Sequence, residues 1–153
     1  QNKIRIHPNI YVNGKVCLSI LGTWSGPSWT SAMDIINVLI TIQSLLDNNP
    51  LCNEPGYEKV KNNSEIIHNN YNLIIEYNTL NSLILDRINT EFEDFNIFKD
   101  DMIKYFENNK NNIISKVQKN KAKYKDILNI KIGLYNIYEF IDYNKLYNKY
   151  LKI

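Results

Sequence analysis

The chain has 153 residues, of which 44% are hydrophobic, and this length and composition suit one globular domain or part of one. Its formal net charge is +2, which gives no strong indication of a nucleic acid or an acidic membrane as a partner. The two cysteines lack paired spacing, which argues against a disulfide framework and favours a reducing compartment: the cytoplasm, the nucleus or both. No run of about 18 or more apolar residues predicts a transmembrane span.

The most informative stretch is residues 7–29, where a tight turn is followed by a cysteine. Asn13-Gly14 is a strong turn signal, and Cys17 follows it inside an apolar run. Because a cysteine thiolate is the most nucleophilic side chain near neutral pH, Cys17 is a candidate for covalent catalysis. The alternative is that Cys17 is a small buried hydrophobic residue, as a lone cysteine in an apolar run usually is.

Three residues that precede the turn bear on the chemistry of Cys17. Asn9 precedes it by eight residues, and its carboxamide is able to donate a hydrogen bond to an oxyanion that forms near the sulfur. Pro8 is expected to hold Asn9 in an extended conformation. We expect His7 to fix the loop through its ring nitrogens rather than to act as a base.

Motifs in this stretch and in the loop after residue 50 carry a family resemblance. They are His7-Pro8-Asn9, Asn13-Gly14, the run at residues 14–24 that contains Cys17, and Asn53-Glu54-Pro55-Gly56-Tyr57-Glu58. Together they resemble the signature of ubiquitin-conjugating enzymes, and within that family the large subgroup that includes the Z-type enzyme and the conjugating domain of apollon. The match covers about residues 3–58. Ser19 stands where many small members have Asp, a variant that the subgroup shares.

The resemblance implies an α+β fold class. The chain would be the C-terminal part of a ubiquitin-conjugating fold, mostly helical because the N-terminal helix and strands are missing. Residues 1–60 would form the active-site part of the core, and residues 61–153 the C-terminal helices and a helical extension. The chain starts at Gln1 and reaches the active-site loop within ten residues, where the family has a first helix and a four-stranded meander beforehand. We therefore expect a fragment, and we expect loading of the modifier to require the upstream residues, because in the family the activating enzyme grips that first helix.

The resemblance also implies a function. Cys17 would carry ubiquitin or a ubiquitin-like modifier as a thioester and transfer it to a lysine amine, with Asn9 as the second catalytic residue. The residues that would support the active-site loop are His7, Pro8, Asn53 and Glu54. The implied partners are the modifier, a ubiquitin-activating enzyme and a ubiquitin ligase, with no nucleic acid, no membrane, and no metal or organic cofactor.

Other function classes stay open. One is a catalytically inactive binding or scaffold module of the same fold, against which the presence of both Asn9 and Cys17 argues. A remoter one is a helical scaffold or RNA-binding piece in which the C-terminal helices carry the activity. A zinc site is not expected, because the cysteines and histidines lack the spacing of zinc ligands.

The chain after Cys17 first forms a loop and then a helix. Gly, Ser and Pro at residues 22–30 predict the loop, in which Trp24 and Trp29 are expected to be core anchors or, alternatively, a surface for the modifier or a ligase. Apolar spacing predicts a helix over residues 31–46, with Ser31 as its cap and Asp34 at the capping-box position.

A second loop, over residues 51–58, follows this helix. Small members of the family have an acidic residue in the equivalent loop, where it helps to deprotonate or orient the incoming lysine. Asn53 or Glu54 is the nearest equivalent in this sequence.

Three more amphipathic helices are predicted, over residues 64–88, 92–117 and 134–151, with their tyrosines and phenylalanines in the core. A lysine-rich run at residues 116–125 is interpreted as a solvated helix face. Weak docking of an acidic partner surface is the alternative for that run.

Overall fold

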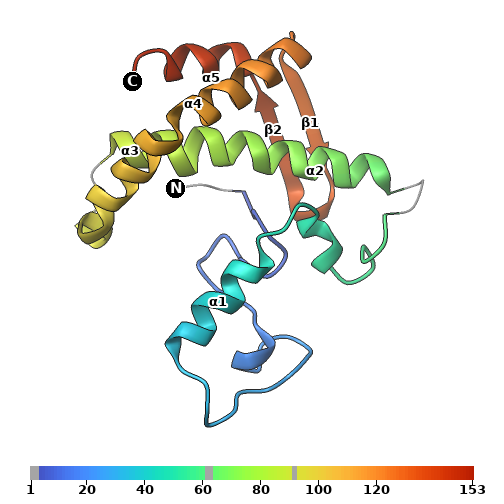
Figure 1. Ribbon diagram of the computed structural model, residues 1–153. Coiled ribbons are helices and arrows are strands. Elements are labelled where there is room, and N and C mark those ends of the chain that lie inside the picture. The colour runs from blue at the N-terminus through green and yellow to red at the C-terminus, as the bar shows by residue number, and fades with distance from the viewer. Residues whose placement is uncertain (1–3, 61–63, 91–92) are drawn as a thin grey trace. The chain divides into compact units, whose positions relative to one another are not determined.

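A computed structural model of the chain describes residues 4–60, 64–90 and 93–153, apart from the side chains of residues 93–95 (Figure 1). The chain divides into two compact units, Gln1–Asn72 and Leu73–Ile153, and each has its own buried side chains. Helices dominate the described ranges, and the one sheet within them has two antiparallel strands. The prediction of a mostly helical α+β chain is confirmed.

Helix α1 of the first unit spans Ile35–Leu45. It begins there because the Asp34 carboxylate accepts hydrogen bonds from the backbone N–H groups of Ile36 and Asn37, at 2.9 and 3.2 Å. The side chain of Asn37 closes a capping box by accepting from the Asp34 N–H at 2.8 Å. The predicted start at residue 31, with Ser31 as the cap, is therefore wrong: an Asp–Asn pair stops the helix from extending further back.

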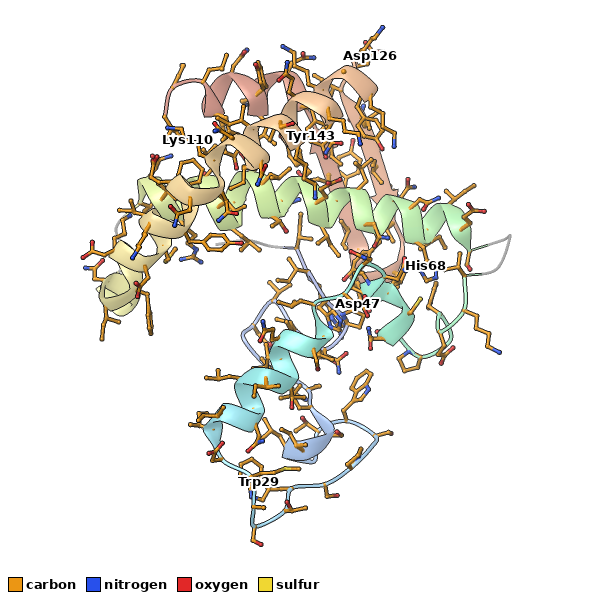
Figure 2. The ribbon with its side chains drawn as sticks, in the orientation of Figure 1. Trp29, Asp47, His68, Lys110, Asp126 and Tyr143 are labelled. Atoms are coloured by element: carbon orange, nitrogen blue, oxygen red, sulfur yellow. The ribbon has the colours of Figure 1, made fainter. Side chains whose placement is uncertain are left out.

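No residue of α1 is buried, although Val38, Ile42 and Leu45 are half-buried; the other apolar residues of this helix are exposed. Those that are more than half exposed are Ile35, Ile36, Leu39 and Ile40. Trp29, in the loop before α1, is 46% exposed (Figure 2). Its predicted role as a core anchor is wrong, since residues 22–34 form no helix or strand that could cover the indole ring. Trp24 is half-buried.

A long helical stretch follows, built from α2 (Glu65–Asn78), a π-helical segment (Thr79–Asp86) and the single turn α3 (Arg87–Asn89). The predicted helix over residues 64–88 is confirmed, although its middle is wound more widely than an α-helix. The Lys99 ammonium caps the stretch by donating to the carbonyls of Arg87, Ile88 and Thr90 at 3.2, 2.8 and 3.0 Å.

Helix α4 spans Lys99–Lys123 and follows a 3-10 segment, Glu93–Phe98. It starts later and ends later than the helix predicted over residues 92–117; residue 92 itself lies outside the described residues. Acidic side chains stand in its first turn and lysines in its last turn. This arrangement complements the helix dipole and stabilises both ends of α4.

The predicted helix over residues 134–151 is wrong in its first half, which is part of a β-hairpin. Strand β1 (Leu128–Ile132) pairs with β2 (Ile137–Ile141) in antiparallel register. Tyr135 and Asn136 adopt positive φ angles of 62° and 54° and reverse the chain between the strands. Isoleucines at alternate positions point into the core; the buried ones are Ile130, Ile132, Ile137 and Ile141. Tyr138 and Phe140, on the opposite face of β2, are more than half exposed, so the prediction that they lie in the core is wrong.

Helix α5 spans Tyr143–Tyr150 and packs beside α4 in the second unit (Figure 1). It buries Tyr143, Leu146 and Tyr150, and Figure 2 shows Tyr143 in this helix pair. The Tyr150 hydroxyl donates to the carbonyl of Leu80 in the π-helical segment at 2.5 Å. Across the described ranges, no helix combines the length and the hydropathy needed to cross a bilayer.

Candidate active site

Backbone hydrogen bonds shape a tight turn just before Cys17. The Gly14 N–H donates to the carbonyl of Tyr11 at 3.0 Å, and the Tyr11 N–H donates to the carbonyl of Lys15 at 2.9 Å. Gly14 has a φ of +89°, in the left-handed region that glycine adopts without strain. The side chain of Asn13 accepts from the Lys15 N–H at 3.1 Å. The turn that Asn13-Gly14 predicted is therefore present, and it returns the chain so that Cys17 faces Asn9.

Asn9 holds Cys17 by hydrogen bonds on both sides of the cysteine Cα. The Asn9 carbonyl accepts from the Cys17 N–H at 2.8 Å, and its Nδ2 donates to the Cys17 carbonyl at 2.8 Å. Both residues are only 2% exposed. Within the described residues, Oδ1 of Asn9 is buried and has no hydrogen-bond partner. The amide therefore fixes the backbone that carries the sulfur.

His7 is fully buried, and its carbonyl accepts a hydrogen bond from the Ile10 N–H at 3.0 Å. This bond closes a turn with Pro8 and Asn9 at its centre, so the predicted extended conformation of Asn9 is wrong.

Nδ1 of His7 accepts a hydrogen bond from the backbone N–H of Asn9 at 3.0 Å, so the neutral ring carries its proton on Nε2. Burial lowers the pKa of His7 below 6.5; the carboxylate of Asp47 and a backbone hydrogen bond with Leu45 oppose the shift, and Arg5 adds to it. A neutral ring is what this position needs, because only neutral Nδ1 accepts from Asn9.

The second loop reaches the same place through Asn53. This residue ends the 3-10 turn Pro50–Asn53, and its Nδ2 lies 3.2 Å from the Pro50 carbonyl and 3.4 Å from Nε2 of His7. Glu54 follows, and its backbone N–H donates to the carbonyl of Leu51 at 3.0 Å. A chain of contacts thus joins Asn53, His7, Asn9 and Cys17, although 46 residues separate Asn53 from His7. The roles of Asn53 and Glu54 toward an incoming amine stay predictions.

The chain just after Cys17 is held by Thr23. Its hydroxyl accepts from the Leu18 N–H at 2.9 Å and lies 3.2 Å from the Leu18 carbonyl. Between these two residues runs the 3-10 turn Ser19–Leu21, which ends at Gly22 with a φ of 66°. Sequence reasoning missed Thr23; the pair Gly22-Thr23 after an apolar run was the available signal, because such hydroxyls bond to nearby backbone.

Arg5 and Tyr71 support the loop from the other side. The Arg5 guanidinium donates to the Pro8 carbonyl and stacks over the ring of Tyr11, 3.7 Å from its centroid. The hydroxyl of Tyr71, a fully buried residue of α2, donates to the Arg5 carbonyl at 2.7 Å. Burial raises the pKa of Tyr71, so its hydroxyl remains a donor at neutral pH. The sequence identified Tyr71 only as a core residue of a helix.

Cys17 and Cys52 are both free thiols, and Cys52 is half-buried. The described residues contain no group of three His, Cys, Asp or Glu side chains that could hold a metal ion. The arrangement around Cys17 thus offers a single sulfur nucleophile candidate with a rigidly held backbone and a neighbouring carboxamide.

A family model described as "Ubiquitin-conjugating enzyme" matches residues 2–78. Proteins named "Ubiquitin-conjugating enzyme E2 Z" from Danio rerio and Homo sapiens are 48% and 49% identical over 87 and 85 residues, which is 57% and 56% of this chain. A protein of Arabidopsis thaliana, "Probable ubiquitin-conjugating enzyme E2 25", is 54% identical over 63 residues, 37% of this chain and 10% of its own length. The chain spans 26% and 23% of the two E2 Z proteins.

Proposed function

The chain belongs to the ubiquitin-conjugating enzyme family and resembles its Z-type members, as the motifs around Cys17 predicted, and from this premise we propose a thioester function. Cys17 carries ubiquitin or a ubiquitin-like modifier as a thioester and passes it to a lysine amine. The observation that carries the proposal is the pair of hydrogen bonds by which Asn9 holds the backbone of Cys17.

The proposed reaction has two acyl transfers. In the first, the Cys17 thiolate attacks the modifier's thioester carbonyl on the activating enzyme, and the activating enzyme's thiolate leaves. In the second, a lysine amine attacks the Cys17 thioester, loses a proton, and the Cys17 thiolate leaves. A positioned backbone favours both steps, because the reacting sulfur must meet the carbonyl in a narrow range of geometry.

Asn9 has a positioning role in this proposal and an electrostatic one. Its Nδ2 already donates one N–H to the Cys17 carbonyl. The second N–H of the same amide is the one that would stabilise an oxyanion beside the sulfur. His7 supports Asn9 in turn, because its Nδ1 accepts the Asn9 backbone N–H.

The burial of Cys17 sets a condition on this function. At 2% exposure the thiol cannot meet a protein-bound carbonyl until the side chains around it move aside. The same observation favours the alternative function, a binding module of the same fold that does not use its cysteine. Only the thioester function predicts that the modifier becomes attached to Cys17, so a loading experiment distinguishes the two functions.

Family members in general work with ubiquitin, activating enzymes and ligases. For this chain we propose the same three classes of partner. We also propose a location in the cytoplasm, the nucleus or both, which the two free thiols support.

A loading assay tests the proposal. The protein at full length is incubated with activating enzyme, ATP and ubiquitin and run on a non-reducing gel beside Cys17→Ser, Cys17→Ala and the control Cys52→Ser. We expect an adduct that a reducing thiol removes; it persists in the Cys52 variant, resists thiol in Cys17→Ser as an oxygen ester, and vanishes in Cys17→Ala. An adduct that survives in Cys17→Ala refutes the role of Cys17, and a folded chain that forms no adduct supports the binding module.

A further inference from the structure

An open cavity of about 370 Å³, lined by polar and apolar surface in similar amounts, lies in the second unit, between the C-terminal end of α4 and the first turns of α5. Its lining side chains come from α4, from the residues just after it and from α5. They are Gln118, Lys121, Ala122, Lys125, Asn144 and Tyr147. Steps of three and four along the chain place them on facing surfaces of two helices that lie side by side (Figure 1).

The charge of the cavity is one-sided, because its lining contains two lysines and no carboxylate. In the part of the chain that the structure describes, neither Lys121 nor Lys125 forms an ion pair. Two lysines further back along α4 do pair: Lys110 with Glu107 at 4.0 Å, and Lys116 with Glu76 at 2.8 Å. The ammonium groups at the cavity therefore remain available to an anion.

Neighbouring groups hold the cavity in shape. The Lys121 ammonium lies 4.5 Å from the centroid of the Tyr147 ring, a cation–π contact that restricts its rotamers. Asn144 Nδ2 donates to the Lys125 carbonyl at 3.0 Å and ties the first turn of α5 to the chain after α4. The second N–H of Asn144 and the amide of Gln118 add neutral donors beside the two charges.

The surroundings strengthen the positive potential. Residues 110–153 contain ten lysines and three acidic residues. Of those acids, Asp142 is engaged as the cap of α5, where its carboxylate accepts from the Lys145 N–H at 2.8 Å. Asp126, the acidic residue nearest to Lys125 in sequence, is exposed and points outward past the end of α4 (Figure 2). Like charges gathered in this way attract anions from solution.

We propose that this cavity binds a small phosphate-bearing anion, supplied as a free phosphate ester or as a phosphorylated lipid headgroup. A phosphate monoester carries close to two negative charges at neutral pH and so matches the two ammonium groups of the lining, whereas a carboxylate carries only one. Lysine binds phosphate as a point charge and needs no bidentate geometry. The site is independent of Cys17 and of thioester chemistry.

Calorimetric titration of the whole chain with inorganic tripolyphosphate, at fixed ionic strength, tests the site. The cavity variant is Lys121→Gln with Lys125→Gln, and the matched control is Lys119→Gln with Lys123→Gln, which removes the same charge from exposed positions of α4 outside the lining. We expect the cavity variant to weaken binding about tenfold or more, and the control about twofold or less. Circular dichroism checks that each variant is folded. If the double cavity variant unfolds, Lys125→Gln alone replaces it, because Lys125 is exposed.

The source of the phosphate is resolved in a second arm, co-sedimentation with phosphatidylcholine vesicles that contain a phosphorylated phosphatidylinositol. Co-sedimentation that depends on Lys121 and Lys125 assigns a lipid headgroup, and tripolyphosphate binding without it assigns a free ester; both support the site. Equal losses in the cavity and control variants would overturn it in favour of a diffuse basic field. If the unaltered chain does not bind tripolyphosphate, the proposed site is also overturned. The lysines then only complement the dipole of α4.

Discussion

At the scale of single residues, the two cysteines of the chain sit in different surroundings. Cys17 is 2% exposed and its backbone is held by Asn9, whereas Cys52 is half-buried in a 3-10 turn. Reaction of a thiol requires that the reagent reach the sulfur. A comparison of the reaction rates of the two thiols therefore shows whether a reagent reaches the Cys17 sulfur only after local opening of the fold.

We expect iodoacetamide to alkylate Cys52 about tenfold or more faster than Cys17 in the folded chain, because access to Cys17 requires local opening. Peptide mass spectrometry after timed quenching measures both rates in one sample. In denaturant the rates should converge, which is the internal control. Equal rates in the folded chain would show that the Cys17 sulfur is open to solvent.

His7 is the residue whose ionisation bears on the site. Burial lowers its pKa below 6.5 in the folded chain, so at acidic pH the unfolded chain takes up the proton first. The stability that this position contributes is present above pH 6.5 and is lost as the pH falls from 6.5 through the folded pKa. Protonation also removes the Nδ1 acceptor of the Asn9 N–H and loosens the backbone that positions Cys17.

The expected result is a loss of stability between about pH 7.5 and about pH 5.5 that is smaller in His7→Gln than in the unaltered chain. Urea unfolding at each pH measures it, and the difference between the two proteins at the higher pH gives the baseline cost of the substitution. A pH dependence of the same size in both proteins would mean that His7 is not the group responsible.

At the scale of elements, the start of α1 depends on one cap. Removing the Asp34 carboxylate leaves the N–H groups of Ile36 and Asn37 without their acceptor. Asp34→Ala should reduce the free energy of opening α1 by about 1 kcal/mol, within the usual range for caps. Hydrogen exchange of the α1 amides measures the effect. Ser31→Ala is the matched control and should change the free energy of opening α1 by less than about 0.5 kcal/mol. A larger effect at Ser31 than at Asp34 would show that Ser31 is the cap, as the sequence predicted.

The helical elements were more predictable than the hairpin. Apolar residues spaced three and four positions apart indicated the helices at residues 35–45, 65–89 and 99–123, and most of the predicted helix ends lie within a few residues of the observed ones. The hairpin was missed because Ile137, Ile141 and the tyrosines near them satisfy a helical spacing as well as an alternating one. The hairpin depends on positive φ angles at Tyr135 and Asn136. Neither position is a glycine, so the sequence carried no clear signal for this turn.

At the scale of the whole molecule, the part of the candidate site that is local in sequence could be predicted. The Asn13-Gly14 turn brings Asn9 to Cys17 within eight residues, so the spacing alone indicated their contact. The contact between Asn53 and His7 and the bond from Tyr71 to Arg5 join residues 46 and 66 positions apart. No local pattern specifies such pairs, because they depend on how the loops and α2 pack.

The exposed apolar residues of α1 are a second property of the whole chain that periodicity could not supply. The spacing of Ile35, Leu39 and Ile42 is that of a helix with a buried face, yet no residue of α1 is buried. A pattern of this kind reports which face is apolar and not what covers it. The buried side chains lie elsewhere, with Tyr71 among them in the first unit and Tyr143 in the second.

The claim that Cys17 is the thioester acceptor is tested most directly without an activating enzyme. The chain is mixed with ubiquitin that bears a small-molecule thioester at its C terminus, and intact masses are recorded. We expect one product heavier by one ubiquitin less one water, reversed by a reducing thiol, formed by Cys52→Ser and not formed by the double variant Cys52→Ser with Cys17→Ala. Acyl transfer to the double variant at the same rate as to Cys52→Ser, or no transfer to folded Cys52→Ser, would contradict the claim.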